Sequence, residues 1–549
     1  MNTSKTPSVV VAFLLLGIVQ SGAAQAPHQH DTPGPDAGRL GTVHFTTSCR
    51  PAVAPAFDRG VALLHSFWFS AAIQAFNDVL THDPGCSMAH WGIAMSWWGN
   101  PFGGFRSPQA LANGLSAVER AKTRGPETER ERGYIAAVEA LFVNAGTVDQ
   151  RTRILAYEKA MAQLASRYAA DPEARILYAL ALDQAALPSD KTYANQLKAA
   201  GILEKEFLAQ PDHPGLAHYI IHSFDVPTLA PRALDAARRY AKIAPAAPHA
   251  LHMPSHTFTR VGAWQDSIAS NLASAAAARK DNAATEELHA LDYQVYAYLQ
   301  TAQDGAAKKI VDGIPAVGAR IQTNAAGNAA PPPAGFFALA AIPARYALKR
   351  GAWAEAARLA PRQTAFPWAD AVAYFARALG SARGGNPEAA VQDVDTLSTI
   401  ADGLRKANDA YWSEQVDIQR RVAAAWISYA RGRQEEALAM LREAADREDA
   451  TEKSAVTPGP IKPARELLGE MLLEAGRPAE ALKEFELTTT KEPNRFRGVY
   501  GAARAAAGAG DSRKARMYSA RLIEICARAD KPGRAELQEA RKAARSPAR

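Results

Sequence analysis

A spacing of 34 residues recurs along this chain and constrains its fold more than any other feature of the sequence. Near the C-terminus, Gly510 and Ala515 repeat the pattern of Gly476 and Ala481 at that distance. In both segments a glycine turn separates two stretches whose apolar residues follow helical spacing. Because one helical hairpin cannot bury its apolar face alone, the spacing predicts a stack of many hairpins.

The composition agrees with a long helical stack. A chain of 549 residues exceeds what one compact core usually holds, whereas a stack of repeats has no such limit. Alanine is abundant and 48% of the residues are hydrophobic, which favours helices over strands. The net charge of +7 is spread over alternating acidic and basic residues, so we expect no nucleic-acid partner.

The hairpin LLGEMLLEAGRPAEALKEFELTTTKEPN (residues 467–494) resembles the tetratricopeptide repeat, a helix–turn–helix unit of about 34 residues. The first hairpin has the same small, aromatic and proline positions at Ala72, Phe76 and Pro84. The resemblance covers most of residues 50–530. It implies an all-α, tetratricopeptide-like helix–turn–helix solenoid wound as a right-handed superhelix.

The N-terminus has the pattern of a secretory signal peptide at residues 1–24. Lys5 is followed by the apolar stretch Val9–Val19, which is too short to span a bilayer, and by small residues up to Ala24. We therefore expect an exported protein, periplasmic or secreted, without stable membrane insertion. A retained N-terminal anchor is the alternative.

Breaks in the repeat pattern predict the organisation of the rest of the chain. Residues 25–45 are rich in His, Pro, Gly and Asp and are expected to form a flexible arm. A Pro/Ala/Gly linker at 323–337 contains three consecutive prolines, which disfavour a continuous helix. It would separate an N-terminal solenoid at 46–322, with a histidine-rich site, from a C-terminal solenoid at 338–549.

Three cysteines in an exported chain raise the question of pairing. Cys49 precedes the first helical hairpin and Cys86 follows it. Because an antiparallel hairpin brings its ends together, we predict a Cys49–Cys86 disulfide that clamps the first repeat. Two unpaired thiols are the alternative, and Cys526 is expected to be a buried thiol.

Two pairs of histidines give the strongest indication of chemistry. His218 and His222 are four residues apart, and so are His252 and His256, with an offset of 34 residues between the pairs. A spacing of four places two imidazoles on one face of a helix. The offset places the pairs on neighbouring helices, so we expect all four side chains to converge on the concave face as metal ligands.

Further candidates extend this array. Glu286 stands one period after His252, and His289 follows it, so both are predicted metal ligands at the edge of the array. Asp225 and Asp292 each follow a candidate histidine by three residues. They are either ligands or outer carboxylates that fix the tautomer of a histidine.

Other residues near the array are given different roles. Tyr219, Tyr293 and Tyr296 are expected to line a pocket or to donate protons. His213 and His249 stand near expected helix starts and are interpreted as capping or rim residues. These assignments leave the two histidine pairs, with Glu286 and His289, as the predicted metal site.

Imidazole and carboxylate donors suit a divalent transition metal, namely Zn, Cu or Fe. No cluster of thiols and thioethers accompanies them. His65 and His90 lie several hairpins away and are not expected to join the array. Two alternatives remain: the histidines bind an anionic ligand, or repeat duplication has copied buried, hydrogen-bonded pairs.

The segments HPGLAHYIIHSFD, HALHMPSHTFTRVGAW and HALDYQVYAYLQ together resemble a group of exported bacterial tetratricopeptide-repeat proteins. The resemblance supports treating them as one site and implies no particular activity. One function class is a metal-dependent hydrolase or oxidase of a small molecule. The other is a protein–protein interaction scaffold with a peptide or protein partner in its concave groove, whose histidine cluster is structural or sensory.

Overall fold

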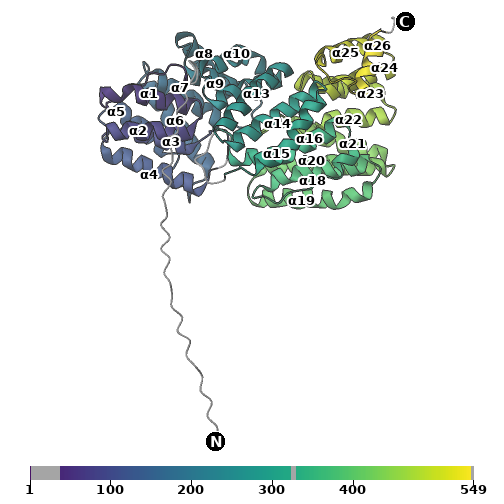
Figure 1. Ribbon diagram of the computed structural model, residues 1–549, viewed down its shortest axis with the longest axis horizontal. Helices are drawn as coiled ribbons and strands as arrows, with labels where there is room; N and C mark the ends of the chain where they lie inside the picture. The colour runs from purple at the N-terminus through teal and green to yellow at the C-terminus, as the bar shows by residue number, and fades with distance from the viewer. Residues whose placement is uncertain (2–37, 105, 323–328, 546–549) are drawn as a thin grey trace.

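The computed structural model describes Met1 and residues 38–104, 106–322 and 329–545 (Figure 1). This part of the chain contains helices and no strand, which confirms the all-α class. Within it, no helix is both long enough and apolar enough to cross a bilayer. The predicted signal peptide at 1–24 and the arm up to residue 37 lie outside the described residues, Met1 excepted.

The helices before the predicted linker are α1 (Ala54–His65), α2 (Phe69–His82), α3 (Ser87–Trp98), α4 (Pro108–Arg124), α5 (Glu129–Glu139), α6 (Gln150–Arg167), α7 (Pro172–Ala185), α8 (Ala194–Ala209), α9 (Pro214–Ser223), α10 (Leu234–Ile243), α11 (Pro248–His252), α12 (Pro254–Arg260), α13 (Trp264–Lys280), α14 (Ala284–Gln300) and α15 (Asp304–Gly318). The later helices are α16 (Pro332–Arg350), α17 (Trp353–Ala356), α18 (Pro367–Arg383), α19 (Val391–Lys406), α20 (Ala410–Ala430), α21 (Gln434–Asp449), α22 (Ala464–Glu474), α23 (Pro478–Lys491), α24 (Phe496–Gly508), α25 (Ser512–Ile525) and α26 (Ala535–Arg545). Short 3₁₀ helices cover Pro51–Val53, Ala230–Ala233 and Pro387–Ala390.

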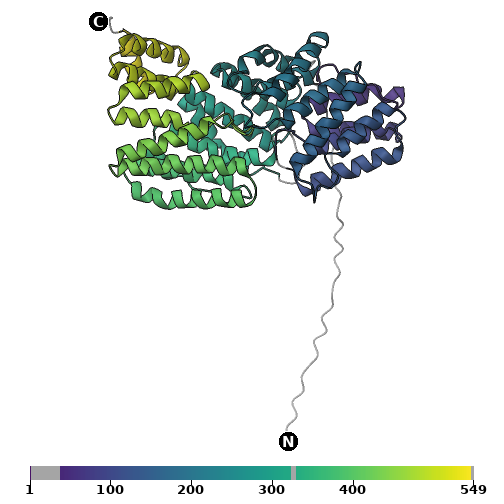
Figure 2. The same cartoon turned by 180° about the vertical axis from the view of Figure 1, so that it is seen from behind.

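Helices that follow one another in the chain pack against one another, as α1 does with α2 and α24 with α25. Figures 1 and 2 show the resulting elongated stack, which begins with α1 and α2 at one end and reaches α25 and α26 at the other. The same packing device recurs at both ends. A Cβ atom at Gly92 would lie 2.3 Å from the ring of Phe76, and one at Gly501 would lie 2.3 Å from the ring of Phe485. Glycine at these positions lets the aromatic ring of one helix touch the backbone of the next.

The end of the predicted flexible arm is packed, which corrects that prediction for residues 38–45. Leu40, Val43 and Phe45 are buried in the hydrophobic core. The ring of Phe45 lies 5.2 Å from that of Trp91. Spaced apolar side chains bury this segment although its backbone is not helical.

The predicted linker is shorter than expected at its C-terminal end. Helix α16 begins at Pro332, because proline is well tolerated in the first turn, where its missing N–H is not needed. Helix α16 also packs against α14 from the other side of the linker, and Ile342 shares a core cluster with Leu291. The division into two solenoids stays a prediction.

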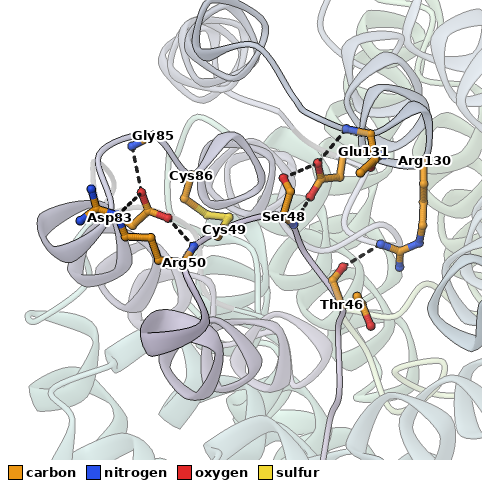
Figure 3. Close-up of a disulfide and its surroundings, with 10 residues drawn as sticks. Thr46, Ser48, Cys49, Arg50, Asp83, Gly85, Cys86, Arg130 and Glu131 are labelled. Atoms are coloured by element: carbon orange, nitrogen blue, oxygen red, sulfur yellow. Dashed lines mark hydrogen bonds and ion pairs between the residues drawn. A yellow bond between two sulfur atoms is a disulfide. The ribbon is translucent and has the colours of Figure 1, made fainter.

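A disulfide joins Cys49 to Cys86, with Cα atoms 4.9 Å apart (Figure 3). The carboxylate of Asp83 lies beside it and accepts hydrogen bonds from the backbone N–H groups of Arg50 and Gly85, at 2.8 and 3.3 Å. The chain entering the first hairpin is thereby fastened to the chain leaving it.

The double variant Cys49→Ser/Cys86→Ser is expected to lower the free energy of unfolding by about 2–4 kcal/mol, because a crosslink restricts the unfolded chain. Chemical denaturation followed by circular dichroism measures the change. Reduction of the wild type should produce the same loss, whereas reduction should leave the variant unchanged. Equal stability of oxidised and reduced wild type would contradict the prediction.

Candidate metal centre

Three histidines from two neighbouring helices form what we call the first triad. His218 and His222 lie one turn apart on α9, and His249 lies on α11. The Nε2 atom of His218 is 3.1 Å from the Nε2 atoms of both other histidines. Two Zn–N bonds of roughly 2.0–2.1 Å at a tetrahedral angle place their nitrogens about 3.3 Å apart, so this spacing suits joint ligands.

The second triad consists of His252 on α11, His256 on α12 and His289 on α14. Met253 separates α11 from α12, which begins at Pro254, a residue that lacks the N–H needed to continue the preceding helix. The Nε2 atoms of His252 and His256 nevertheless lie 3.1 Å apart. The ring centroid of His289 is 4.5 Å from that of His252.

The two triads adjoin each other. Within each, one ring nitrogen from every histidine lies within 4.8 Å of the others. Between them, the ring centroids of His249 and His252 are 6.1 Å apart, and those of His222 and His256 are 6.3 Å apart. The six imidazoles therefore form one cluster with two centres, which contains the five histidines predicted as ligands together with His249.

Hydrogen bonds fix the tautomers of two histidines in the second triad. The Nδ1 atom of His252 lies 2.7 Å from Oδ1 of Asn271, and the Asn271 amide donates in turn to the carbonyl of Ser267. The Nδ1 atom of His256 lies 2.9 Å from a carboxylate oxygen of Asp225. Both partners only accept, so Nδ1 carries the proton in each histidine and Nε2 carries a lone pair.

Two lone pairs thus face each other at 3.1 Å between His252 and His256. They repel unless a cation or a proton lies between them. The hydroxyl of Tyr293, 3.1 Å from Nε2 of His256, has one proton and can serve only one of the two nitrogens. Burial lowers the pKa of both histidines, which opposes a further proton. A metal ion would accept both lone pairs.

In the first triad, a hydrogen bond fixes the tautomer of His218. The Nδ1–H group of His218 donates to the backbone carbonyl of His65 at 2.7 Å, so the lone pair of His218 is on Nε2, between His222 and His249. Burial lowers the pKa of His218 to about 3 and those of His222 and His249 well below their usual range. The three imidazoles are neutral at physiological pH, as metal ligation requires.

A segment from the C-terminal half closes the cluster. Residues 450–463, between α21 and α22, bring the ammonium of Lys453 to 2.8 Å from Asp225, which also receives a hydrogen bond from Arg260 at 2.8 Å. Burial pushes the pKa of Asp225 upward, but these two cations and His256 outweigh burial and hold it well below its usual range. Asp225 is therefore an ionised acceptor for His256.

The predicted ligand Glu286 and the carboxylate Asp292 lie outside the cluster. The Oε1 atom of Glu286 accepts a hydrogen bond from the backbone N–H of Ala330 at 2.6 Å, and Asp292 forms a buried ion pair with Arg345 at 2.8 Å. Neither carboxylate belongs to the two histidine groups, and Asp292, predicted as a ligand or as an outer carboxylate, is paired with Arg345 and not with a histidine. His249, interpreted from the sequence as a rim residue, belongs to the first triad.

The three predicted pocket tyrosines have separate surroundings. Tyr293 touches the second triad and also reaches the carbonyl of Thr457 at 3.3 Å. Tyr219 is buried beside His65, with its hydroxyl 2.8 Å from Nδ1. The hydroxyl of Tyr296 lies 3.3 Å from Glu492, away from the cluster. Tyr293 and Tyr219 thus both lie beside clustered histidines, since the ring of Tyr219 is 5.2 Å from that of His218, whereas Tyr296 lines a different pocket.

Sequence reasoning missed a buried network behind the first triad. The carboxylate of Glu173 accepts from Nε2 of His65 and Nε2 of His213, at 2.9 Å each. A Cβ atom at Gly215 would lie 2.6 Å from the His65 ring, so glycine is needed there. This network holds His65, whose carbonyl orients His218. Because His65, Glu173 and His213 lie far apart in the sequence, no residue spacing predicts that they meet.

A cavity of about 730 Å³ reaches the cluster from outside. It lies between segments from both sides of the predicted linker, and its walls include Asp225 and Lys453. Of the six clustered histidines, His222 alone lines it, and the ring of Phe102 stacks on His222 at 4.1 Å. The histidines are thus mostly buried instead of lying open on a concave face, and His222 connects them to the cavity.

Glu286 gives the protein a pH dependence that a variant can isolate. Burial raises the pKa of this carboxyl to about 7, so between about pH 4.5 and 7 the native state retains a proton that the unfolded state loses. Stability should fall as the pH rises through this window. Glu286→Gln should remove part of that fall in denaturation experiments, and the exposed control Glu435→Gln should not. A parallel fall in wild type and Glu286→Gln would contradict this assignment.

No protein-family model matches the chain, and no curated protein matches its sequence. Among solved structures, a tetratricopeptide repeat protein from Parabacteroides merdae is 13% identical, with a TM-score of 0.29; the match covers 55% of this chain and 99% of that one. Human IFIT1, solved as a dimer with m7Gppp-AAAA, is 12% identical, with 80% and 90% coverage and a TM-score of 0.39. Cut9, in the APC/C hetero-tetramer Cut9–Hcn1, is 12% identical, with 90% and 96% coverage and a TM-score of 0.28.

Such distant likenesses carry no statement about activity. Solenoids of helical hairpins present extended surfaces, and the fold by itself supports an interaction scaffold. The six-histidine cluster is the additional feature to be explained. From its own packing of successive helix–turn–helix units, the described chain is an all-α solenoid similar to tetratricopeptide-repeat proteins.

Proposed function

We propose that the two triads bind two transition-metal ions, and that the chain is a metal-dependent enzyme for a small molecule held in the adjoining cavity. The observation that carries this proposal is the pair of lone pairs facing each other between His252 and His256 at 3.1 Å. Their Nδ1–H groups are committed to Asn271 and Asp225, which is how metal-binding histidines are usually oriented.

The donor set suits Zn, Cu or Fe. Each triad offers three neutral imidazoles, and these ions accept imidazole readily. Three protein ligands leave at least one coordination position for water or substrate, as in catalytic rather than structural zinc sites. A bound ion would supply Lewis acidity or redox chemistry, which is compatible with hydrolysis and with oxidation.

The surrounding residues define what the protein contributes. Asp225 and the carbonyl of His65 hold two histidines in the ligating tautomer. Tyr293 places a hydroxyl 3.1 Å from His256, where it can hold or deliver a proton. Residues 450–463 limit the access of water to the second triad, and His222 leaves the first triad in contact with the cavity. An ion that a substrate in the cavity can reach through the first triad favours an enzyme over a scaffold with a purely structural ion.

The predicted signal peptide, which lies outside the described residues, fits the same proposal. An exported protein would acquire its metal outside the cytoplasm, and Zn, Cu and Fe all remain candidates there.

Elemental analysis of the purified full chain after metal loading and dialysis tests the proposal. We expect two equivalents of Zn, Cu or Fe in the wild type, and one equivalent each in His218→Ala and His252→Ala. The double variant should retain none. His90→Ala removes a buried histidine outside the triads and should keep both ions. Wild-type protein without stoichiometric metal, or variants that keep it, would reject the metal centre.

A further inference from the structure

The cavity beside His222 has an aromatic wall. The rings of Trp368 and Trp412 stack at 3.8 Å with an interplanar angle of 8°, and both line the cavity. Phe102, which stacks on His222, and Leu187, with 50% of its surface exposed, also line this cavity. Flat apolar side chains of this kind favour a planar aromatic ligand, because stacking removes the ligand ring and the protein ring from water together.

One carboxylate in the lining of this cavity lacks a hydrogen-bond donor. Asp183 lines the cavity, is 7% exposed, and its Oδ1 atom has no hydrogen-bond partner in the described structure. Its Oδ2 atom lies 2.5 Å from the hydroxyl of Ser223, which also lies 2.9 Å from the carbonyl of Tyr219. The Ser223 hydroxyl donates to Oδ2 of Asp183, which leaves Oδ1 as the oxygen without a donor.

Oδ1 of Asp183 is therefore a buried acceptor that lacks a donor among the described residues. Burial raises the pKa of Asp183 well above its usual range, in agreement with a neutral carboxyl group. The Oε1 atom of Gln196, also in the lining, is a second buried acceptor without a partner in the described residues. Unpaired buried acceptors are costly, so a ligand that donates to them is favoured. Ser223 follows His222 directly, which places this polar end beside the first triad.

The charges of the cavity disfavour an anionic ligand. Lys453 is the single cationic side chain among the described lining residues, and it is already paired with Asp225 at 2.8 Å. Glu452 is paired with Lys191 at 2.8 Å, and Asp409 accepts the backbone N–H of Trp412 at 3.2 Å. Among the protein's own lining side chains no cation is left to neutralise a carboxylate or phosphate, so in the metal-free protein removing such a group from water is unfavourable.

We propose that this cavity binds an uncharged hydroxylated aromatic molecule, a phenol, whose ring lies against the Trp368–Trp412 wall and whose hydroxyl donates to Asp183 or Gln196. This inference rests on the proposed function, because it names the substrate class of the same site. A volume of about 730 Å³ accommodates more than one ring, so the phenol carries a further ring or substituent of similar size.

Isothermal titration calorimetry with three probes of nearly equal shape tests the proposal. 4-Phenylphenol offers two rings and a donor, 4-methoxybiphenyl lacks the donor, and biphenyl-4-carboxylate replaces the hydroxyl with an anion. We expect the full chain to bind 4-phenylphenol at least about tenfold more tightly than either other probe, since an unpaired acceptor or a buried charge costs that much. Equal or tighter binding of the carboxylate, or no binding of 4-phenylphenol, would overturn the proposal.

Two variants locate the binding site. Trp412→Leu should weaken all probes that bind, whereas Trp353→Leu, a tryptophan outside this cavity, should weaken none. Gln196→Leu occupies a partly exposed position, so it should fold, and it should reduce the preference for 4-phenylphenol over 4-methoxybiphenyl. If Gln196→Leu and Trp412→Leu both bind like the wild type, the ligand lies elsewhere and the proposal fails.

The titrations are made on metal-free and on metal-loaded protein, so that the two proposals fail separately. Selective binding of 4-phenylphenol by a protein that takes up no metal would keep the phenol site and reject the metal enzyme. Stoichiometric metal without selectivity among the probes would keep the metal centre and reject the phenol. A peptide ligand, the alternative occupant, would bind without competition from 4-phenylphenol, which also counts against the phenol.

Discussion

Asp292→Ala is expected to lower the free energy of unfolding by about 3–5 kcal/mol, because it leaves the guanidinium of Arg345 buried without its carboxylate. Both side chains of this ion pair are fully buried, and the Nε–Oδ1 distance is 2.8 Å. Arg345 also donates to the carbonyls of Gly459 and Pro460, at 2.9 and 2.8 Å. The substitution should therefore loosen residues 450–463, which cover the histidine cluster.

Chemical denaturation of metal-free protein measures the loss of unfolding free energy. Hydrogen exchange shows which segments of the chain lose protection. The matched control is Asp312→Ala, which breaks an exposed ion pair with Lys308 and should cost less than about 1 kcal/mol. If both variants lower the free energy of unfolding by the same small amount, the Asp292–Arg345 ion pair does not hold residues 450–463 in place. Faster exchange in residues 450–463 of Asp292→Ala is the specific signature.

Asp225→Asn is expected to weaken metal binding by the second triad about 10- to 100-fold while the first triad keeps its affinity. An asparagine has nearly the shape of aspartate but cannot supply the charge that holds the Nδ1 proton of His256. It also removes the negative charge facing Lys453 and Arg260, so the ion would sit near two unopposed cations.

Competition with a chelator of known affinity gives the two binding constants. Asp393→Asn is the control, since Asp393 is a buried carboxylate paired with Arg377 and remote from the cluster in sequence. It should leave both constants unchanged. Equal weakening of both sites by Asp225→Asn would mean that the two triads do not bind separately.

The repeat period predicts that these histidines come together, because it fixes where backbones lie. It places His218 and His252 on adjacent helices, and the spacing of four adds His222 and His256. The same period failed at Glu286, because it does not fix what a side chain touches: a backbone N–H from Ala330 competes for the carboxylate.

Other parts of the site depend on contacts that local patterns do not contain. His249 stands three residues before His252, so one helical face carries both rings, yet its place near a helix start suggested a rim position. Asp225 follows His222 in sequence but bonds His256 from the next hairpin. Lys453 meets Asp225 across 228 residues, a contact that no spacing within one repeat predicts.

The segment at 450–463 has a consequence for biogenesis. A nascent chain that has emerged only as far as α20 already contains every histidine of the two triads, yet it lacks Lys453 and the carbonyl of Thr457. Repeat proteins can acquire order hairpin by hairpin. In this protein, the enclosed form of the cluster exists only after synthesis has passed residue 463. Residues that are synthesised late therefore complete a pocket whose histidines were synthesised much earlier.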